Sequence, residues 1–211
     1  MSGILDLLNS NSGKDLISGI EQQFGINKAS VAKVLGSAIP MILGGMRNNA
    51  SSSSGASDLL GALLGGNHNG SILDNIGSIL GGSSVDHNVM TDGGNILGHI
   101  FDGQENNAAH VVSKSGGIDM SQAMNIMKTV APFVMGYIGK MMHSNGVSDQ
   151  GGLKGVLGGL LGDDTDSQRD VASRIQGFDN NDDTIDDLAG LVGDLGKNSG
   201  GIANLLSGLF S

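Results

Sequence analysis

The stretch GINKASVAKVLGSAIPMILGGM, residues 25–46, is the part of this chain that decides its fold. A glycine, an apolar residue and the capping residue Asn27 are followed by apolar side chains at the 3-1-3-1 spacing of one helix face. The members of that face are Val31, Val34, Leu35, Ala38, Ile39, Ile42, Leu43 and Met46. Pro40 lies inside the predicted helix, where it removes one backbone donor and is expected to kink the helix.

The same pattern returns 92 residues later in GIDMSQAMNIMKTVAPFVMGYI, residues 117–138, and residues 3–46 align with residues 95–138 without a gap. Three kinds of position share a predicted role, namely a helix-ending glycine, a helix cap and a proline inside the next helix: Gly25 and Gly117, Asn27 and Asp119, Pro40 and Pro132. We therefore predict an all-helical (all-α) fold of two tandem copies of one helical unit, related by a pseudo-twofold, with Pro-kinked central helices.

The second half of the unit also recurs, because residues 57–80 align with residues 169–192 at an offset of 112. The larger offset predicts an insertion in the second copy near residues 145–162. The chain then divides into a first helical unit, a second helical unit and a short apolar C-terminal tail, at residues 1–92, 93–196 and 197–211. Loops are expected at Ser51–Ser54, Gly81–Gly93 and Ser144–Gly151, and short amphipathic helices at Ile72–Leu80 and Ile185–Val192.

The composition is rich in glycine and poor in aromatic residues, with 37 Gly, 5 Phe, 1 Tyr and no Trp among 211 residues. Collagen is excluded because Pro is nearly absent and the glycines have no three-residue period. Most glycines lie inside apolar stretches, as at residues 60–63 and 158–161. They indicate either close packing between helices or helices of marginal stability.

The chain is acidic, with a net charge of −10, and 10 of its 21 acidic residues lie between Asp163 and Asp194. Such a charge repels nucleic acid and anionic membrane surfaces, so we expect no nucleic-acid partner. Residues 1–6 lack a basic stretch followed by an apolar one, and no run approaches the roughly 20 apolar residues that cross a bilayer. We therefore expect no secretory signal, no transmembrane segment and a cytoplasmic protein.

Nothing in the sequence has the pattern of an enzyme. The chain has no cysteine, no Gly-x-Ser-x-Gly elbow beside a strand, and no Gly-Lys-Ser/Thr of a phosphate loop. The histidines lack the i, i+4 spacing of a helical metal site: His68, His87, His99, His110 and His143. His99 aligns with Leu7 and is expected to be a partly buried packing residue. We predict a non-catalytic protein without a cofactor.

Several short motifs together resemble a known bacterial family. They are Ile4-Leu5-Asp6-Leu7-Leu8, Phe24-Gly25-Ile26, Ala38-Ile39-Pro40, Asn48-Asn49-Ala50-Ser51, Gly70-Ser71-Ile72-Leu73-Asp74-Asn75, Gly94-Asn95-Ile96-Leu97-Gly98-His99-Ile100, Lys114-Ser115-Gly116 and Ala131-Pro132. In combination they resemble the YidB-like domain of unknown function, over most of residues 1–145 and again around residues 177–192. The resemblance implies an all-helical fold and brings no activity, cofactor or catalytic residue with it.

Members of that family often carry Asp-x-Asp-x-Asp-Gly-Ser at the loop before the short helix, a pattern similar to half of a calcium loop. In this chain the pattern is eroded, since position 12 of the loop is Ile76 in the first copy and Leu188 in the second. The candidate oxygen ligands are Asp179, Asn181, Asp183, Asp186 and Asp187 in the second loop and Asn67, Asn69 and Asp74 in the first. The alternative is a plain turn, in which Ser71 caps a helix and Asp74 completes the capping box.

Two functions remain open on the sequence. The first is protein–protein interaction or self-assembly into a homo-oligomer, because the apolar segments Leu153–Leu161 and Ile202–Phe210 are too short to span a membrane and need another surface to cover them. That surface is this chain's own core, another copy or a partner. The second function is weak Ca²⁺ binding through the Asp/Asn loops. A Met-rich helix near residues 120–142 fits either a core or an adaptable binding face.

Overall fold

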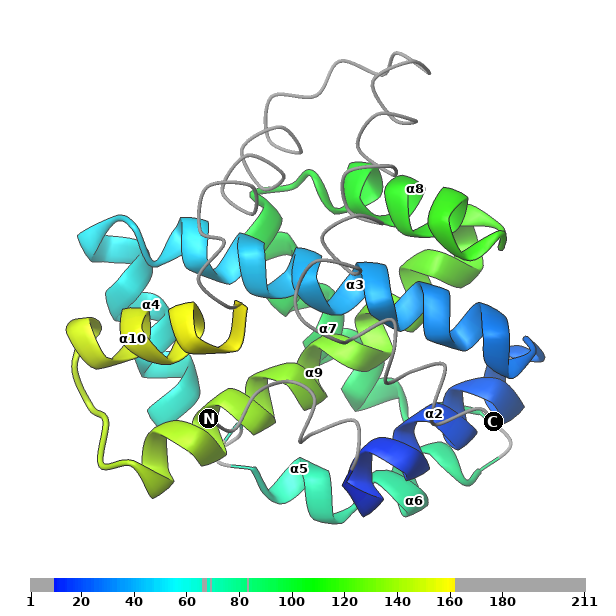
Figure 1. The fold of residues 1–211 in the computed structure, drawn as a ribbon, viewed down its shortest axis with the longest axis horizontal. Coiled ribbons are helices and arrows are strands. Elements are labelled where there is room, and N and C mark those ends of the chain that lie inside the picture. Colours follow the sequence, from blue (N-terminus) through cyan, green and yellow to red (C-terminus); the bar gives the residue numbers. More distant parts are fainter. Residues whose placement is uncertain (1–9, 66–67, 69, 83, 162–211) are drawn as a thin grey trace.

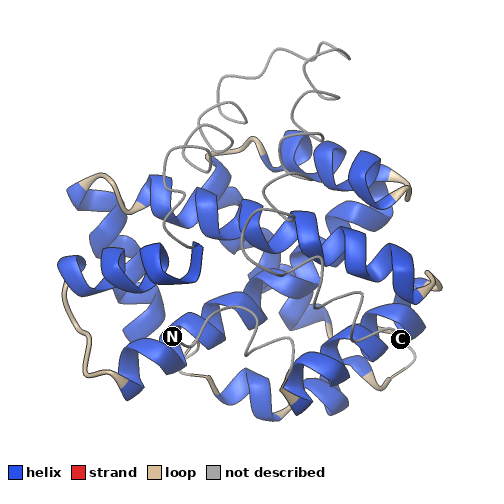
Figure 2. Ribbon diagram, in the orientation of Figure 1, coloured by secondary structure: helices blue, strands red, loops and turns tan. Residues whose placement is uncertain are grey.

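The computed structural model describes residues 10–65, 68, 70–82 and 84–161, and every regular element within these residues is a helix (Figure 2). In chain order they are α2 (Asn11–Phe24), α3 (Lys28–Asn49), α4 (Ser53–Leu64), α5 (Ser71–Asp74), α6 (Ile76–Leu80), α7 (His87–Phe101), α8 (Glu105–Gly116), α9 (Met120–Ser144) and α10 (Gln150–Leu161). The all-helical prediction is confirmed for this part of the chain.

The core is built around α3 and α9, the two longest helices of the described part at 22 and 25 residues. Both are buried along most of their length, α3 from Ser37 to Met46 and α9 from Thr129 to Gly139 without interruption. The other helices surround this pair, with α8 on one side, α2, α5 and α6 on the other, and α4 and α10 together at one end (Figure 1). The buried residues form one continuous aliphatic core.

The two helix junctions predicted from the repeated pattern have the same caps. Gly25 after α2 and Gly117 after α8 are left-handed, with φ of 63° and 64°, a conformation that glycine adopts without strain. The Asn27 side chain accepts a hydrogen bond from the Ser30 amide at 2.9 Å. Asp119 accepts one from the Gln122 amide at 2.8 Å. The capping predictions are therefore confirmed, because each satisfies an amide that the next helix leaves unpaired.

Both central helices continue through their proline. Pro40 and Pro132 each lie 12 residues after the first residue of their helix, and both are buried. The kinks and the pseudo-twofold relation stay predictions.

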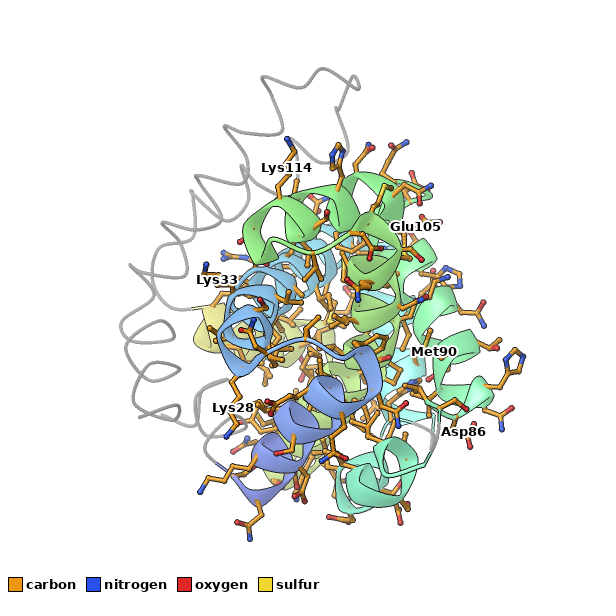
Figure 3. All side chains as sticks on the ribbon, turned by 90° about the vertical axis from the view of Figure 1, so that its right-hand side faces the viewer. Lys28, Lys33, Asp86, Met90, Glu105 and Lys114 are labelled. Atoms are coloured by element: carbon orange, nitrogen blue, oxygen red, sulfur yellow. The ribbon has the colours of Figure 1, made fainter. Side chains whose placement is uncertain are left out.

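Glycine allows α7 to cross α9 at very short range. A Cβ atom on Gly93 would collide with the backbone carbonyl of Lys128. Met90 lies one turn before Gly93 in α7, and its sulfur accepts a hydrogen bond from the Thr129 hydroxyl of α9 at 3.3 Å. Figure 3 labels Met90 on α7. Close packing is thus confirmed at this crossing, whereas Gly61, Gly158 and Gly159 have no such neighbour within 4 Å.

Three expectations about the connecting segments are wrong. The predicted loop Gly81–Gly93 contains the first half of α7. Asp86 caps the N-terminus of this helix, because its side chain accepts a hydrogen bond from the Asn88 amide at 2.7 Å. The predicted helix Ile72–Leu80 is divided into α5 and α6, because the backbone leaves the helical conformation at Asn75, where φ is −114°. The first of these two helices has Gly70 at its N-cap position, so Ser71 does not cap it.

The segment Leu153–Leu161, which the sequence left without an assigned surface, covers the chain's own core. Leu153, Leu157, Leu160 and Leu161 of α10 are all buried, and the helix packs on α3, α4 and α9. Of the two apolar segments that suggested self-assembly, this one is therefore covered within the chain.

By length and composition α3 is apolar enough to cross a membrane, with a mean hydropathy of 1.4 over 18 residues. This corrects the expectation that no segment of the chain is apolar enough. Within the protein 72% of that window is buried. Lys28 and Lys33 lie at its outer side in Figure 3. A central helix buried by its neighbours needs this composition for packing, so α3 alone is weak evidence for a membrane span.

Candidate functional site: a groove between α4 and α7

A groove of about 260 Å³ opens on the surface between α4 and α7, and we call it the α4–α7 groove. Figure 1 shows the two helices that form its walls. Its lining residues come from five parts of the chain: Asp58, Leu59 and Ala62 of α4, Asp92, Asn95, Ile96, His99 and Ile100 of α7, Asn49 of α3, Met135 of α9, and His68. The groove is therefore a product of the tertiary fold.

The inner surface of the groove is apolar. Leu59 and Ile96 are each 7% exposed, and Ile100 and Met135 are each 2% exposed. These side chains belong to the core and show one edge to the groove. A ligand that displaces water from this surface gains the hydrophobic contribution of the area it covers, about 25 cal/mol per Å².

The rim of the groove is polar, and one helix supplies much of it. Asp92, Asn95 and His99 follow each other along α7 at i, i+3 and i+7, so they lie on one face of the helix. At 1.5 Å per residue the row is about 10 Å long. Asp58 on α4 stands on the other wall and is exposed. Two carboxylates thus border the groove from opposite helices.

His68 closes one end of the groove. Its side chain is 10% exposed, and its Nδ1 and Nε2 atoms lie 3.2 Å from the Ala62 carbonyl and 3.0 Å from Oδ2 of Asp92. Since a carbonyl and a carboxylate both accept, the two hydrogen bonds form together only when both ring nitrogens carry a proton. Asp92 is 43% exposed, so its contact with His68 is partly solvated and adds little to the free energy of folding.

Glycine positions His68 as it positions α7. A Cβ atom on Gly139 would collide with the His68 carbonyl, so the absence of a side chain there lets the backbone of His68 lie directly on α9. Gly70, with φ of 99°, then turns the chain into α5 in a conformation that other residues rarely adopt.

The other end of the groove is held by Asn49, the last residue of α3. Its side-chain amide donates a hydrogen bond to the His99 carbonyl at 3.0 Å, which ties the end of α3 to α7. The His99 side chain itself is exposed, so the expectation that it is partly buried is wrong. Its neighbours Ile96 and Ile100 take the inward positions of the helix, and residue 99 falls outside them.

The predicted calcium-loop residues do not meet at this groove. Asp74 is exposed on α5. Asn67, Asn69 and the whole second loop, with Asp179, Asn181, Asp183, Asp186 and Asp187, lie outside the described residues. Within the described residues no group of three or more His, Asp or Glu side chains is placed to hold a metal ion. Calcium binding stays a prediction.

The sequence analysis named several groove residues but did not bring them together as a site. His68 lies between two candidate ligands of the first Asp/Asn loop, Asp92 belongs to no motif, and the two are 24 residues apart. The usable signal is on α7, where a polar row at Asp92, Asn95 and His99 lies beside the apolar pair Ile96 and Ile100. A helix with such a boundary borders solvent, but the sequence does not show that a second helix stands opposite.

Comparison with known proteins identifies the family. The family model described as "Bacterial protein of unknown function (DUF937)" matches residues 6–141, which is more than half of the chain. The chain therefore belongs to this family, the YidB-like family that the sequence motifs indicated. The match ends inside α9 and does not reach α10. No match was found among curated proteins or among solved structures.

Proposed function

We propose that this chain is a non-catalytic protein-interaction module, and that the α4–α7 groove is the surface where it holds its partner, a different protein or a second copy of itself. The observation that carries the proposal is the groove itself. It combines an apolar inner surface with a polar rim, the arrangement found at binding sites.

The chemistry of the groove supports binding over catalysis. Among the described residues that line it there is no hydroxyl, thiol or amine that could act as a nucleophile. His68 is held by two acceptors, which fixes the ring in place but gives it no hydroxyl to activate. Acyl transfer through a serine, threonine or cysteine of the groove is therefore not supported, and the apolar lining favours binding.

The proposal includes the predicted duplication, which three further features support. The helices α4 and α10 are each 12 residues long and follow a side-chain cap: Ser52 accepts from the Gly55 amide and Asp149 from the Gly152 amide. They carry LGALLG, residues 60–65, and LGGLLG, residues 157–162. The proposed equivalents also pack on each other, α3 on α9 and α4 on α10, as elements beside a twofold axis do.

Pairing α4 with α10 moves the proposed insertion. If residues 150–161 are the counterpart of α4, the range 145–162 contains a helix of the repeat and is not the insertion. The extra residues of the second unit then follow Leu161. The proposal also keeps a cytoplasmic location, which the burial of α3 in the core supports.

Photo-crosslinking in the bacterial host tests the proposed function. A benzophenone amino acid replaces Asn95, which is exposed on the rim, or Ser18, which is exposed on α2 and does not line the groove. We expect an adduct of discrete mass from position 95 and none from position 18. An adduct of twice the chain mass supports self-assembly, and any other discrete mass supports a different protein partner.

A groove-filling variant makes the test specific. Ala62 is exposed and lines the groove, so Ala62→Trp fills it without entering the core. We expect this change to abolish the adduct from position 95 while circular dichroism shows an intact helical fold. Equal adducts from positions 95 and 18, or an adduct that survives Ala62→Trp, would exclude the groove as the interaction surface.

A further inference from the structure

We infer that the α4–α7 groove accepts the side chain of a lysine from a basic protein partner, with the aliphatic stem on Ile96, Ile100 and Met135 and the ammonium between Asp58 and Asp92. The inference rests on the proposed function and names the chemistry of the partner.

The size of the groove limits its occupant. Pockets for drug-sized ligands and cofactors have volumes of about 300–1,000 Å³, and this groove, at about 260 Å³, lies below that range. It holds one side chain or a fragment of comparable size. A nucleotide or a larger cofactor does not fit inside it.

The apolar lining selects an occupant with an aliphatic part. Leu59, Ile96, Ile100 and Met135 offer methyl and methylene groups, while Phe, Tyr and Trp are absent from the described residues that line the groove. The lining therefore favours a flexible aliphatic chain over a cation held by an aromatic ring.

The charge of the rim selects a cation. Asp58 forms no hydrogen bond or ion pair with any described residue, and Asp92 uses only Oδ2 for His68, so that Oδ1 remains available to a donor. Two carboxylates therefore border the groove with acceptor oxygens that an ammonium group can use.

The placement of the two carboxylates favours lysine over arginine. Asp58 and Asp92 stand on different helices, and each offers a separate acceptor from its own wall. Arginine binds best to one carboxylate through two parallel hydrogen bonds, whereas the three donors of an ammonium point to separate acceptors. The strongly acidic chain, at −10, also attracts a basic partner over a longer range.

Binding of n-butylammonium, which is the lysine side chain without its backbone, tests the chemistry. The readout is the NMR shift of the methyl groups of Ile96, Ile100 and Met135 in the full chain. We expect saturable shifts with a Kd of about 1 mM, in the range of such small ligands. Its neutral isostere 1-butanol should bind about tenfold more weakly, because charge-assisted hydrogen bonds are stronger.

Two charge variants separate a local effect from the net charge. Asp58→Asn keeps the shape of the exposed side chain and should weaken n-butylammonium about tenfold while leaving 1-butanol unchanged. Asp15→Asn removes the same charge from the exposed face of α2 and should change neither affinity. Equal affinities for n-butylammonium and 1-butanol, or an Asp58→Asn variant without effect, would overturn the inference.

Nα-acetyl-lysine-N-methylamide distinguishes a protein side chain from a free amine. We expect it to bind at least as tightly as n-butylammonium. If it is excluded while n-butylammonium binds, the occupant is a free amine and the lysine inference is wrong. The proposed function fails by a different result, the loss of groove-specific crosslinking from position 95, so the two failures are distinguishable.

Discussion

The helices α4 and α10 have the same length and end in the similar stretches LGALL and LGGLL, yet they occupy different environments. α10 buries Leu153, Leu157, Leu160 and Leu161. α4 buries Ala56, Leu59 and Leu63, and leaves Leu64, its last residue as Leu161 is of α10, 46% exposed. One helix completes the core, and the other forms the wall of a groove.

The difference shows that an apolar pattern fixes which face of a helix turns inward but not how completely that face is covered. The residues that decide the coverage lie elsewhere in the chain. Beside α4, the polar row of α7 and the buried ring of His68 keep the space open. The groove therefore lies where the surroundings of α4 differ from those of α10.

The largest expected effect contrasts one leucine from each helix. Leu157→Ala removes a side chain that is 1% exposed and should lower the free energy of unfolding by about 2–5 kcal/mol. Leu64→Ala, at the exposed end of α4, should change it by about 0.5 kcal/mol or less. Urea denaturation measures both. Equal losses would mean that α4 and α10 are covered alike.

The next effect concerns α7, the opposite wall of the groove. Gly93→Ala places a methyl group against the Lys128 carbonyl and should destabilise the protein by about 1–3 kcal/mol. Gly98→Ala, in the same helix with nothing within 4 Å, should instead stabilise it by up to about 1 kcal/mol through helix propensity. Thermal unfolding followed by circular dichroism compares them. A stable Gly93→Ala variant would contradict the close crossing of α7 and α9.

The smallest effect concerns the two Asp/Asn loops of the repeat. If the second loop binds calcium with a Kd of about 1 mM, then 2 mM calcium should add about 0.6 kcal/mol to the free energy of unfolding. The gain should appear as a small rise in Tm and should disappear in Asp179→Ala. No rise in the unmodified chain would end the calcium proposal for both loops.

Local signals made much of the scaffold predictable. The caps at Asn27 and Asp119 and the left-handed glycines at 25 and 117 depend only on neighbouring residues, so the sequence locates both helix junctions. The first half of α7 was not predictable in this way. Residues 87–93 have little apolar periodicity, and their helix is held by its Asp86 cap and by the crossing with α9.

The groove was not predictable because it depends on contacts between distant segments. His68 reaches Asp92 only because Gly139 lets its segment lie on α9. The burial of His99 was predicted wrongly because alignment with Leu7 transfers a residue position and not its environment. Two segments with aligned sequences can still pack against different neighbours, and the neighbours decide which side chains are buried.

The most direct test of the central claim compares thiol accessibility at the last residue of α4 and the last residue of α10. The chain has no cysteine, so Leu64→Cys and Leu161→Cys each introduce one unique thiol, at sites that are 46% and 4% exposed. Under native conditions we expect maleimide to label the Leu64→Cys variant as fast as the urea-unfolded chain. The Leu161→Cys variant should react at least about tenfold more slowly, since the thiol must be exposed first. Equal native rates for the two variants would contradict the claim that α10 completes the core while the end of α4 is left open to solvent.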